Sequence, residues 1–146
     1  MATTEITERL GLLKLAADTQ CGTLRMAAAS MFLVRYDVDA IRATYRREKT
    51  VMLDTIRRHF PQEVTCTDPA GGMFTWLTFP EGFDVACFMA EHALPDAKVA
   101  YVPGGGFYPV VEEADHARIS YSSPSEEVIT RGMTALGQLL TRRLRG

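Results

Sequence analysis

The sequence has few of the residues that build disulfide frameworks, metal sites or membrane segments. Its three cysteines, Cys21, Cys66 and Cys87, lie far apart and show no C-x-x-C spacing. This argues against a disulfide framework or a zinc site and predicts a protein of the reducing cytoplasm. The three histidines do not form a ligand pair at helical spacing, so no metal site is expected. No signal-peptide pattern and no run apolar enough to span a bilayer is visible, which predicts no membrane association.

A strong charge of one sign is also missing. The formal net charge is -2 over 146 residues, which gives no electrostatic reason to expect nucleic acid or an anionic membrane as a partner. Basic residues do cluster on one predicted helix, at Arg42, Arg46, Arg47, Lys49, Arg57 and Arg58. Because apolar residues alternate with them at helical spacing, we interpret the cluster as the solvated face of an amphipathic helix.

Helical patterns fill the first sixty residues. Thr4 is expected to cap a first helix, and Asp37 is expected to cap a longer one that ends at Phe60-Pro61. Between them, residues 23–35 are apolar on most sides, which predicts a buried helix.

Short strands replace the helical pattern after residue 60. Alternating and β-branched segments predict strands at Val64–Thr67, Met73–Phe79, Val99–Val102 and Ala117–Tyr121. Asp84 is expected to cap a helix that Pro95 ends. In the last helix Ser123 at the N-cap, Pro124 at the first position and Glu126 at the third form a capping box.

The order of these elements predicts an α/β (α+β-like) fold, in which N-terminal helices precede a β-β-α-β-β-α succession. A small sheet should be covered by helices on one face. The length of 146 residues suits a single domain over residues 1–146, with residues 1–60 as a helical lead-in and residues 61–146 as the sheet-containing part.

No reaction can be assigned from catalytic motifs. A Ser-His-Asp or Cys-His set and a G-x-S-x-G elbow are missing from the sequence. The triplet Gly104-Gly105-Gly106 is not followed by G-K-[ST] or by a predicted helix, so we interpret it as a sharp turn and not as a phosphate loop.

Arg118 is the candidate binding residue because it lies inside a predicted strand. The period of two places Arg118, Ser120 and Ser122 on one face, and Ile119 and Tyr121 on the other face as core. Arg118 is then either a strand arginine in water or in a surface ion pair, or a bidentate anchor for a carboxylate. The strand alone leaves both open.

A series of short motifs connects the chain to a known family. In order, they are Gly71-Gly72-Met73-Phe74-Thr75-Trp76, Pro80-Glu81-Gly82, Val99-Ala100-Tyr101-Val102-Pro103-Gly104 with Phe107, Arg118-Ile119-Ser120-Tyr121-Ser122, and a helix that begins Pro124-Ser125-Glu126-Glu127 and includes Gly132 and Leu136. No single motif is specific, but the ordered series covers the chain from about Ile6 to its end. The series resembles the C-terminal small domain of class I/II, fold-type I pyridoxal-phosphate-dependent aminotransferases, in the 2-aminoadipate-type and regulator-associated branch.

The resemblance implies a role for Arg118. In this family the arginine of the R-[LI]-S-[FY]-S strand binds the α-carboxylate of the amino-acid substrate, which orients the substrate for reaction. The intact protein is then expected to be a homodimeric enzyme that uses pyridoxal 5'-phosphate to move an amino group between an amino acid and a 2-oxo acid. Phe107 and Tyr108 are expected either to line the rim of the site or to pack in the interior.

The family's Schiff-base lysine has no counterpart in this chain. The only lysines are Lys14, Lys49 and Lys98, and none follows the serine-rich strand end that the family motif requires. The resemblance places the start of the matched segment just downstream of that lysine. We therefore expect no catalytic and no cofactor-binding residue in this chain, no bound pyridoxal phosphate, and no activity from the chain alone.

Two other interpretations stay open at this point. The chain is alternatively an aminotransferase-like effector domain of a transcription regulator. It is otherwise a stand-alone α/β module that binds carboxylates through Arg118.

Overall fold

The computed structural model describes residues 3–18, 20–108 and 114–145. The chain divides into two compact units, Met1–Ala40 and Ile41–Gly146, and the boundary lies within the helix α3 (Val38–His59). Asp37 precedes this helix and accepts a hydrogen bond from the backbone N–H of Asp39 at 2.8 Å, which confirms the cap expected there.

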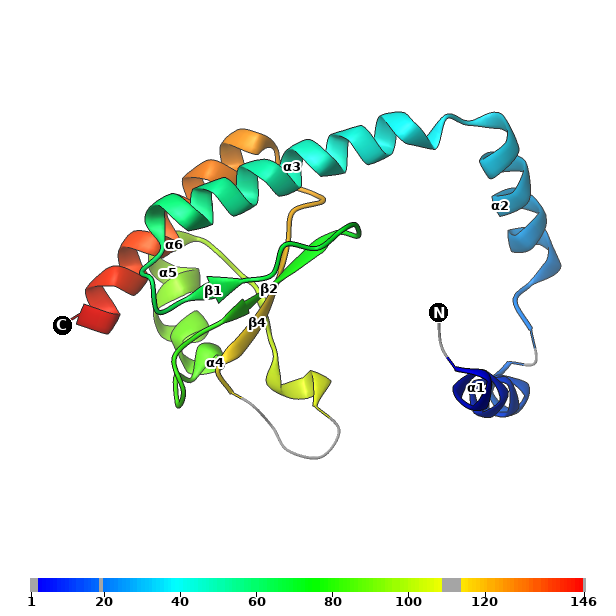
Figure 1. The fold of residues 1–146 in the computed structure, drawn as a ribbon, viewed down its shortest axis with the longest axis horizontal. Coiled ribbons are helices and arrows are strands. Elements are labelled where there is room, and N and C mark those ends of the chain that lie inside the picture. The colour runs from blue at the N-terminus through cyan, green and yellow to red at the C-terminus, as the bar shows by residue number, and fades with distance from the viewer. Residues whose placement is uncertain (1–2, 19, 109–113, 146) are drawn as a thin grey trace. The chain divides into compact units, whose positions relative to one another are not determined.

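The first unit contains the helices α1 (Thr4–Ala17) and α2 (Thr23–Arg35), shown in blue in Figure 1. The cap of α1 is Thr3, whose hydroxyl accepts from the N–H of Ile6, and not Thr4 as expected; Thr4 is the first helical residue. No residue of α1 or α2 is buried, so the expectation that residues 23–35 form a buried helix is wrong for this chain. The apolar side chains of α2 lack a covering layer within their unit.

The second unit contains a four-stranded sheet and the helices that cover it (Figure 1). After α3 its elements are β1 (Thr65–Cys66), β2 (Phe74–Thr78), α4 (Val85–Phe88), the π-helix η1 (Met89–Ala93), α5 (Leu94–Ala97), β3 (Val102–Pro103), the 3-10 helix η2 (Gly105–Phe107), β4 (His116–Ser120) and α6 (Glu126–Arg145). The strand order is β1-β2-β4-β3 and every pair is antiparallel. The predicted fold class is confirmed.

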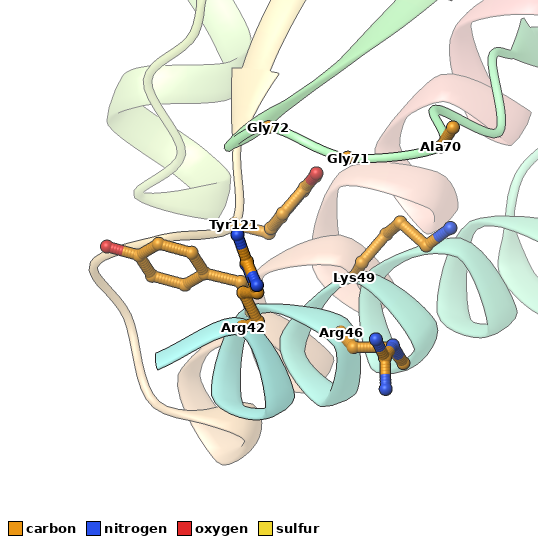
Figure 2. Close-up of a pocket in the computed structure, with 8 residues that line it drawn as sticks. Arg42, Arg46, Lys49, Ala70, Gly71, Gly72 and Tyr121 are labelled. Carbon is orange, nitrogen blue, oxygen red and sulfur yellow. The ribbon is translucent and has the colours of Figure 1, made fainter. Parts of the chain in front are cut away.

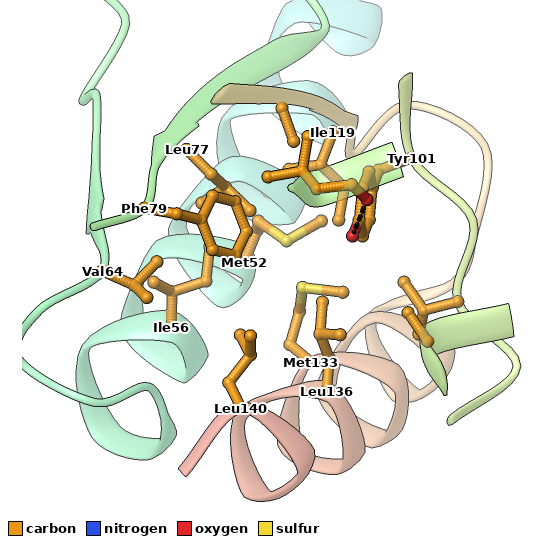
Figure 3. Packing of buried hydrophobic residues seen from close by; sticks show 14 of the residues in the cluster. Met52, Ile56, Val64, Leu77, Phe79, Tyr101, Ile119, Met133, Leu136 and Leu140 are labelled. Carbon is orange, nitrogen blue, oxygen red and sulfur yellow. Dashed lines mark hydrogen bonds between the residues drawn. The ribbon is translucent and has the colours of Figure 1, made fainter. Parts of the chain in front are cut away.

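One face of the sheet packs on the helices. Leu77 of β2 and Ile119 of β4 point into a core that Met52 of α3 and Leu136 and Leu140 of α6 complete (Figure 3). All of these side chains are almost fully buried, and removal of such apolar surface from water is the main force that holds the unit together. The predicted core positions Ile119 and Tyr121 are confirmed.

Two further helix boundaries differ from the sequence expectation. Asp84 caps α4 as predicted, since its carboxylate accepts from the N–H groups of Ala86 and Cys87. Pro95 does not end this helix, because the widened turn of the π-helix η1 leads directly into α5. Pro95 lies in the first turn of α5, where its missing N–H is not needed for a helical hydrogen bond. Helix α6 is capped by Ser125, which accepts from the N–H of Val128, and not by Ser123.

The edges of the sheet are short. β1 and β3 each contain two residues, and Pro103 in β3 has no N–H to offer. Within the described part of the chain, no helix has an apolar stretch long enough to cross a bilayer.

Candidate functional site

Arg118 lies at the centre of β4, on the sheet face opposite the helical core. Its neighbours along the strand, Ala117 and Ile119, are buried on the core face, whereas Arg118 is half-buried on the other. The pairing register places Trp76 of β2 on one side of Arg118 and Val102 of β3 on the other. Strands on both sides therefore fix the backbone of Arg118, and its side chain rises from a rigid surface.

Two aromatic rings flank the guanidinium of Arg118. Its Cζ atom lies 4.2 Å from the ring centroid of Phe74 and 4.9 Å from that of Phe107. Cations are attracted to aromatic faces at such distances, so both rings stabilise the guanidinium. Phe107 is in turn held by Trp76, whose ring centroid lies 5.6 Å away in an edge-to-face arrangement.

The position of Phe107 depends on a close backbone approach at Gly104. The N–H of Gly104 donates to the carbonyl of His116 at 2.6 Å, and a Cβ added at Gly104 would lie 2.7 Å from the Cβ of His116. Only glycine fits there without displacement of β4. The glycine triplet is thus a sharp turn, as predicted, that brings η2 and Phe107 beside Arg118.

Part of the Arg118 guanidinium lacks a partner. Its Nε atom is buried without a hydrogen-bond acceptor, and none of the described acidic residues forms an ion pair with Arg118. A buried donor without an acceptor costs free energy, and for a charged group the cost is larger than for a neutral one. This arrangement is suited to an acceptor from outside the described residues, and the planar fork of arginine matches a carboxylate.

Hydroxyl groups near Arg118 on the same strand are engaged locally. Ser120 Oγ donates to the carbonyl of Met73 at 3.3 Å and lies 3.1 Å from Ser122 Oγ. The backbone N–H of Ser122 donates to Ser120 Oγ at 3.3 Å. These bonds fix the exit of β4 and leave Arg118 as the charged group at the centre of the face.

A histidine and an acidic residue occupy the entrance to β4. His116 Nδ1 lies 2.7 Å from Asp115 Oδ1, and the ring centroid of His116 lies 5.9 Å from that of Trp76. Tyr108 is the other aromatic neighbour of His116, at 5.8 Å. The face around Arg118 therefore combines aromatic side chains with one fixed cation.

The three lysines lie outside the strands of the sheet. Lys49 of α3 binds Asp68 and the carbonyl of Pro69, and Lys14 of α1 pairs with Asp18. Lys98 follows α5 in the left-handed backbone conformation. None of the three lysines follows the serine-rich strand end that the family motif requires.

The sequence located Arg118 but missed one of its neighbours. The structure confirms that Arg118 and Ser120 share the face opposite Ile119, and it places Phe107 beside the guanidinium. Phe74 was not predicted as a site residue. Its signal was the alternation in Phe74-Thr75-Trp76, which puts Phe74 on the face of the sheet that carries Arg118 once β2 pairs with β4.

Comparisons with known proteins give aminotransferases and a transcriptional regulator as sequence relatives. Over 121 residues the chain is 33% identical to an uncharacterized aminotransferase from Saccharolobus solfataricus, a match that covers 83% of this chain and 30% of that protein. Over 103 residues it is 36% identical to the 2-aminoadipate transaminase of Thermus thermophilus, with 70% of this chain and 25% of the transaminase covered. An uncharacterized HTH-type transcriptional regulator from Escherichia coli is 26% identical over 121 residues, 81% of this chain and 25% of the regulator.

Solved structures agree with the sequence relatives. The crystal structure of an α-aminoadipate aminotransferase from Thermus thermophilus, complexed with N-(5'-phosphopyridoxyl)-L-leucine, matches with a TM-score of 0.76 and 30% identity. The match covers 99% of this chain and 38% of that chain. No protein-family model matches the chain. The chain thus spans between a quarter and two fifths of the length of these relatives.

Proposed function

Because the chain is homologous to part of the fold-type I pyridoxal-phosphate-dependent aminotransferases, we propose that it is the substrate-anchoring small domain of such an enzyme. The intact protein would transfer an amino group between an amino acid and a 2-oxo acid. Arg118 would bind the α-carboxylate of the amino acid. The cofactor and its lysine would come from the remainder of the protein, and the cofactor would supply the electron sink for the transfer.

The observation that carries the proposal is the environment of the Arg118 guanidinium. The rings of Phe74 and Phe107 lie within cation–π distance of it, and its Nε is buried without an acceptor. The N–H groups in the plane of the guanidinium are then the natural binding surface. Two parallel N–H···O bonds to a carboxylate would satisfy them and would fix the orientation of the substrate, which is itself a source of rate.

The test begins with the gene. The reading frame upstream of Met1 should continue into a segment with a serine-rich strand end and a lysine. In the longer protein, Arg118→Ala should lower kcat/KM for the amino acid roughly a hundredfold, the value expected for loss of two charge-assisted hydrogen bonds. Arg118→Lys should recover only part of the loss, because an ammonium group cannot form the planar fork.

Matched measurements separate an anchor from a structural role. Arg131→Ala removes an exposed arginine of α6 and should leave kcat/KM unchanged. The absorbance of the bound cofactor should also be unchanged in Arg118→Ala. An unaltered KM for the amino acid in Arg118→Ala would contradict the proposed anchor. In the 146-residue chain alone, borohydride reduction with pyridoxal phosphate should label no lysine selectively.

A regulator parent is the second candidate, favoured by the similarity to the regulator from Escherichia coli. A DNA-binding segment upstream, with no transaminase activity in the longer protein, would support it. A stop codon directly upstream of Met1 would instead favour the stand-alone module. That module predicts that a dicarboxylate raises the melting temperature of this chain and that Arg118→Ala abolishes the rise.

Cytoplasmic location and a homodimer belong to the same proposal. The cysteines Cys21, Cys66 and Cys87 are all free, as expected for a protein kept in a reducing compartment. The homodimer rests on the family resemblance, and sedimentation of the longer protein tests it.

A further inference from the structure

A basic pocket lies between α3 and the turn that joins β1 to β2. It encloses about 380 Å³, and its lining residues are Arg42, Tyr45, Arg46, Lys49, Ala70, Gly71, Gly72 and Tyr121. Figure 2 shows the cations on the helix and the Gly71-Gly72 turn across from them. The proposed role of Arg118 does not use this pocket, because Arg118 lies on the sheet face opposite the helices.

The helix side of the pocket concentrates positive charge. Arg42, Arg46 and Lys49 follow one another at spacings of four and three residues, so they share one face of α3. Like charges at such spacings repel and destabilise a helix unless an anion lies between them. In the part of the chain that the structure describes, Arg46 makes no ion pair.

The acidic residue Asp68 lies beside Lys49 of the cluster. Asp68 Oδ1 lies 2.8 Å from Lys49 Nζ, and its other oxygen lies 3.4 Å from Arg57. Asp68 is thus shared with a cation outside the pocket. Asp68 does not offset the charge of Arg46. The exposed side chains of Arg42 and Arg46 agree with the predicted solvated face of the helix, and this face also lines the pocket.

The opposite wall offers uncharged donors. Gly72 has a φ of +97°, and added Cβ atoms at Gly71 and Gly72 would meet nothing within 4 Å, so the backbone of the turn is open to a ligand. None of the hydrogen bonds among the described residues uses the N–H of Gly71 or Gly72. The Tyr121 hydroxyl is directed toward this turn (Figure 2), and burial raises the pKa of Tyr121, so the hydroxyl stays protonated.

We propose that this pocket binds a phosphate group, carried by inorganic phosphate or by a small phosphomonoester. Guanidinium, ammonium, amide and hydroxyl donors converge on one space, and a tetrahedral dianion accepts from several such directions at once. The Gly71-Gly72 turn lets the ligand approach the backbone closely, because no side chains stand in the way. The bound dianion would offset the repulsion along α3.

The test is a titration of the ¹⁵N-labelled chain with inorganic phosphate, at an ionic strength held constant with chloride. We expect saturable chemical-shift changes centred on the amides of Gly71 and Gly72. Arg46→Ala should weaken binding about tenfold or more, because it removes charge-assisted hydrogen bonds. Arg46 is exposed, so its replacement should not affect folding, and an unchanged spectrum without phosphate checks this.

Arg58→Ala is the matched control, since Arg58 is an exposed arginine of the same helix outside the pocket. Equal weakening by Arg46→Ala and Arg58→Ala would mean diffuse attraction and would overturn the proposal, as would shifts that never saturate. Titration with glycerol 3-phosphate identifies the source of the phosphate group. If glycerol 3-phosphate binds more tightly than inorganic phosphate, the natural ligand is a phosphate ester. If it binds equally or more weakly, the ligand is the free phosphate ion. Phosphate binding that is unchanged in Arg118→Ala keeps this test independent of the proposed aminotransferase role.

Discussion

Helices α1 and α6 both contain several leucines, but only α6 buries any of them. Leu12 and Leu13 of α1 are 68% and 67% exposed, whereas Leu136 and Leu140 of α6 are 0% exposed. The leucines of α6, at positions 136, 139, 140 and 144, lie along one stripe, while those of α1 at positions 10, 12, 13 and 15 spread around the helix. Leucine content therefore does not create a core; a single apolar stripe that meets a partner layer does.

The two units also differ in their ion pairs. In α1 the pairs Arg9–Glu5 and Lys14–Asp18 join residues four apart on the same helix. In the second unit Lys49 of α3 reaches Asp68, nineteen positions away in the chain. Charges in α1 thus support only their own helix, whereas Lys49 and Asp68 connect two elements of one unit.

The largest expected difference between the units comes from truncation of leucines. Leu136→Ala should lower the free energy of unfolding by about 2–5 kcal/mol, because it leaves a cavity in the core. Leu13→Ala should change it by less than about 0.5 kcal/mol. Urea unfolding followed by the fluorescence of Trp76, the only tryptophan, reports on the second unit. If the two substitutions lowered the free energy of unfolding equally, the leucines of α1 would contribute to stability as much as those of α6, contrary to this prediction.

Glycine substitutions should change stability less than the leucine substitutions do. Their sign should differ between the two helices. A Cβ at Gly137 of α6 would lie 2.5 Å from the carbonyl oxygen of His59, so Gly137→Ala should destabilise the unit by about 1–3 kcal/mol. Gly11 of α1 has nothing within 4 Å, and Gly11→Ala should stabilise that helix by about 0.5–1 kcal/mol. Circular dichroism at 222 nm and thermal unfolding measure both changes. A stabilising Gly137→Ala would show that α6 does not pack closely on the end of α3.

The smallest effect concerns acid stability. The hydrogen bond from Lys49 holds the pKa of Asp68 below its ordinary value of 3.8. A lowered pKa in the folded state gives stability that is present above 3.8 and is lost as the pH falls through the folded value. Asp68→Asn should therefore flatten the acid side of the melting-temperature profile of the second unit.

Asp18→Asn is the control for the acid profile, because Asp18 pairs only within the first unit. It should leave the Trp76 transition unchanged at every pH. A profile that is the same in Asp68→Asn and in the unaltered chain would show that the contact between Lys49 and Asp68 does not support the fold.

The sequence predicted the elements whose signals are local. Alternation in β2 and β4 placed Ile119 in the core and Arg118 on the opposite face, and the acidic residue Asp84 marked the start of α4. The ordered motifs predicted membership of the aminotransferase family. These features depend on residues that are close together in the chain, so they can be predicted from one sequence.

Two helix details and the features set by distant contacts were missed. Ser125 replaces Ser123 as the cap of α6, and the π-turn before Pro95 continues a helix that the proline should end. Phe74 reaches Arg118 only because β2 pairs with β4, although they are forty residues apart. The basic pocket needs both α3 and the Gly71-Gly72 turn. No short window of sequence contains both partners of the last two contacts.

The short sheet edges determine how molecules of this chain can associate. Strand addition needs a row of unpaired N–H and C=O groups, and β1 and β3 present two residues each, one of them the proline Pro103. Growth of an intermolecular sheet therefore has almost no template here. Self-association instead has apolar helix surface available, such as Leu24 and Val34 of α2, which are 82% and 84% exposed. Aggregates of this chain should accordingly be helical assemblies that dissolve in mild detergent, not cross-β fibrils.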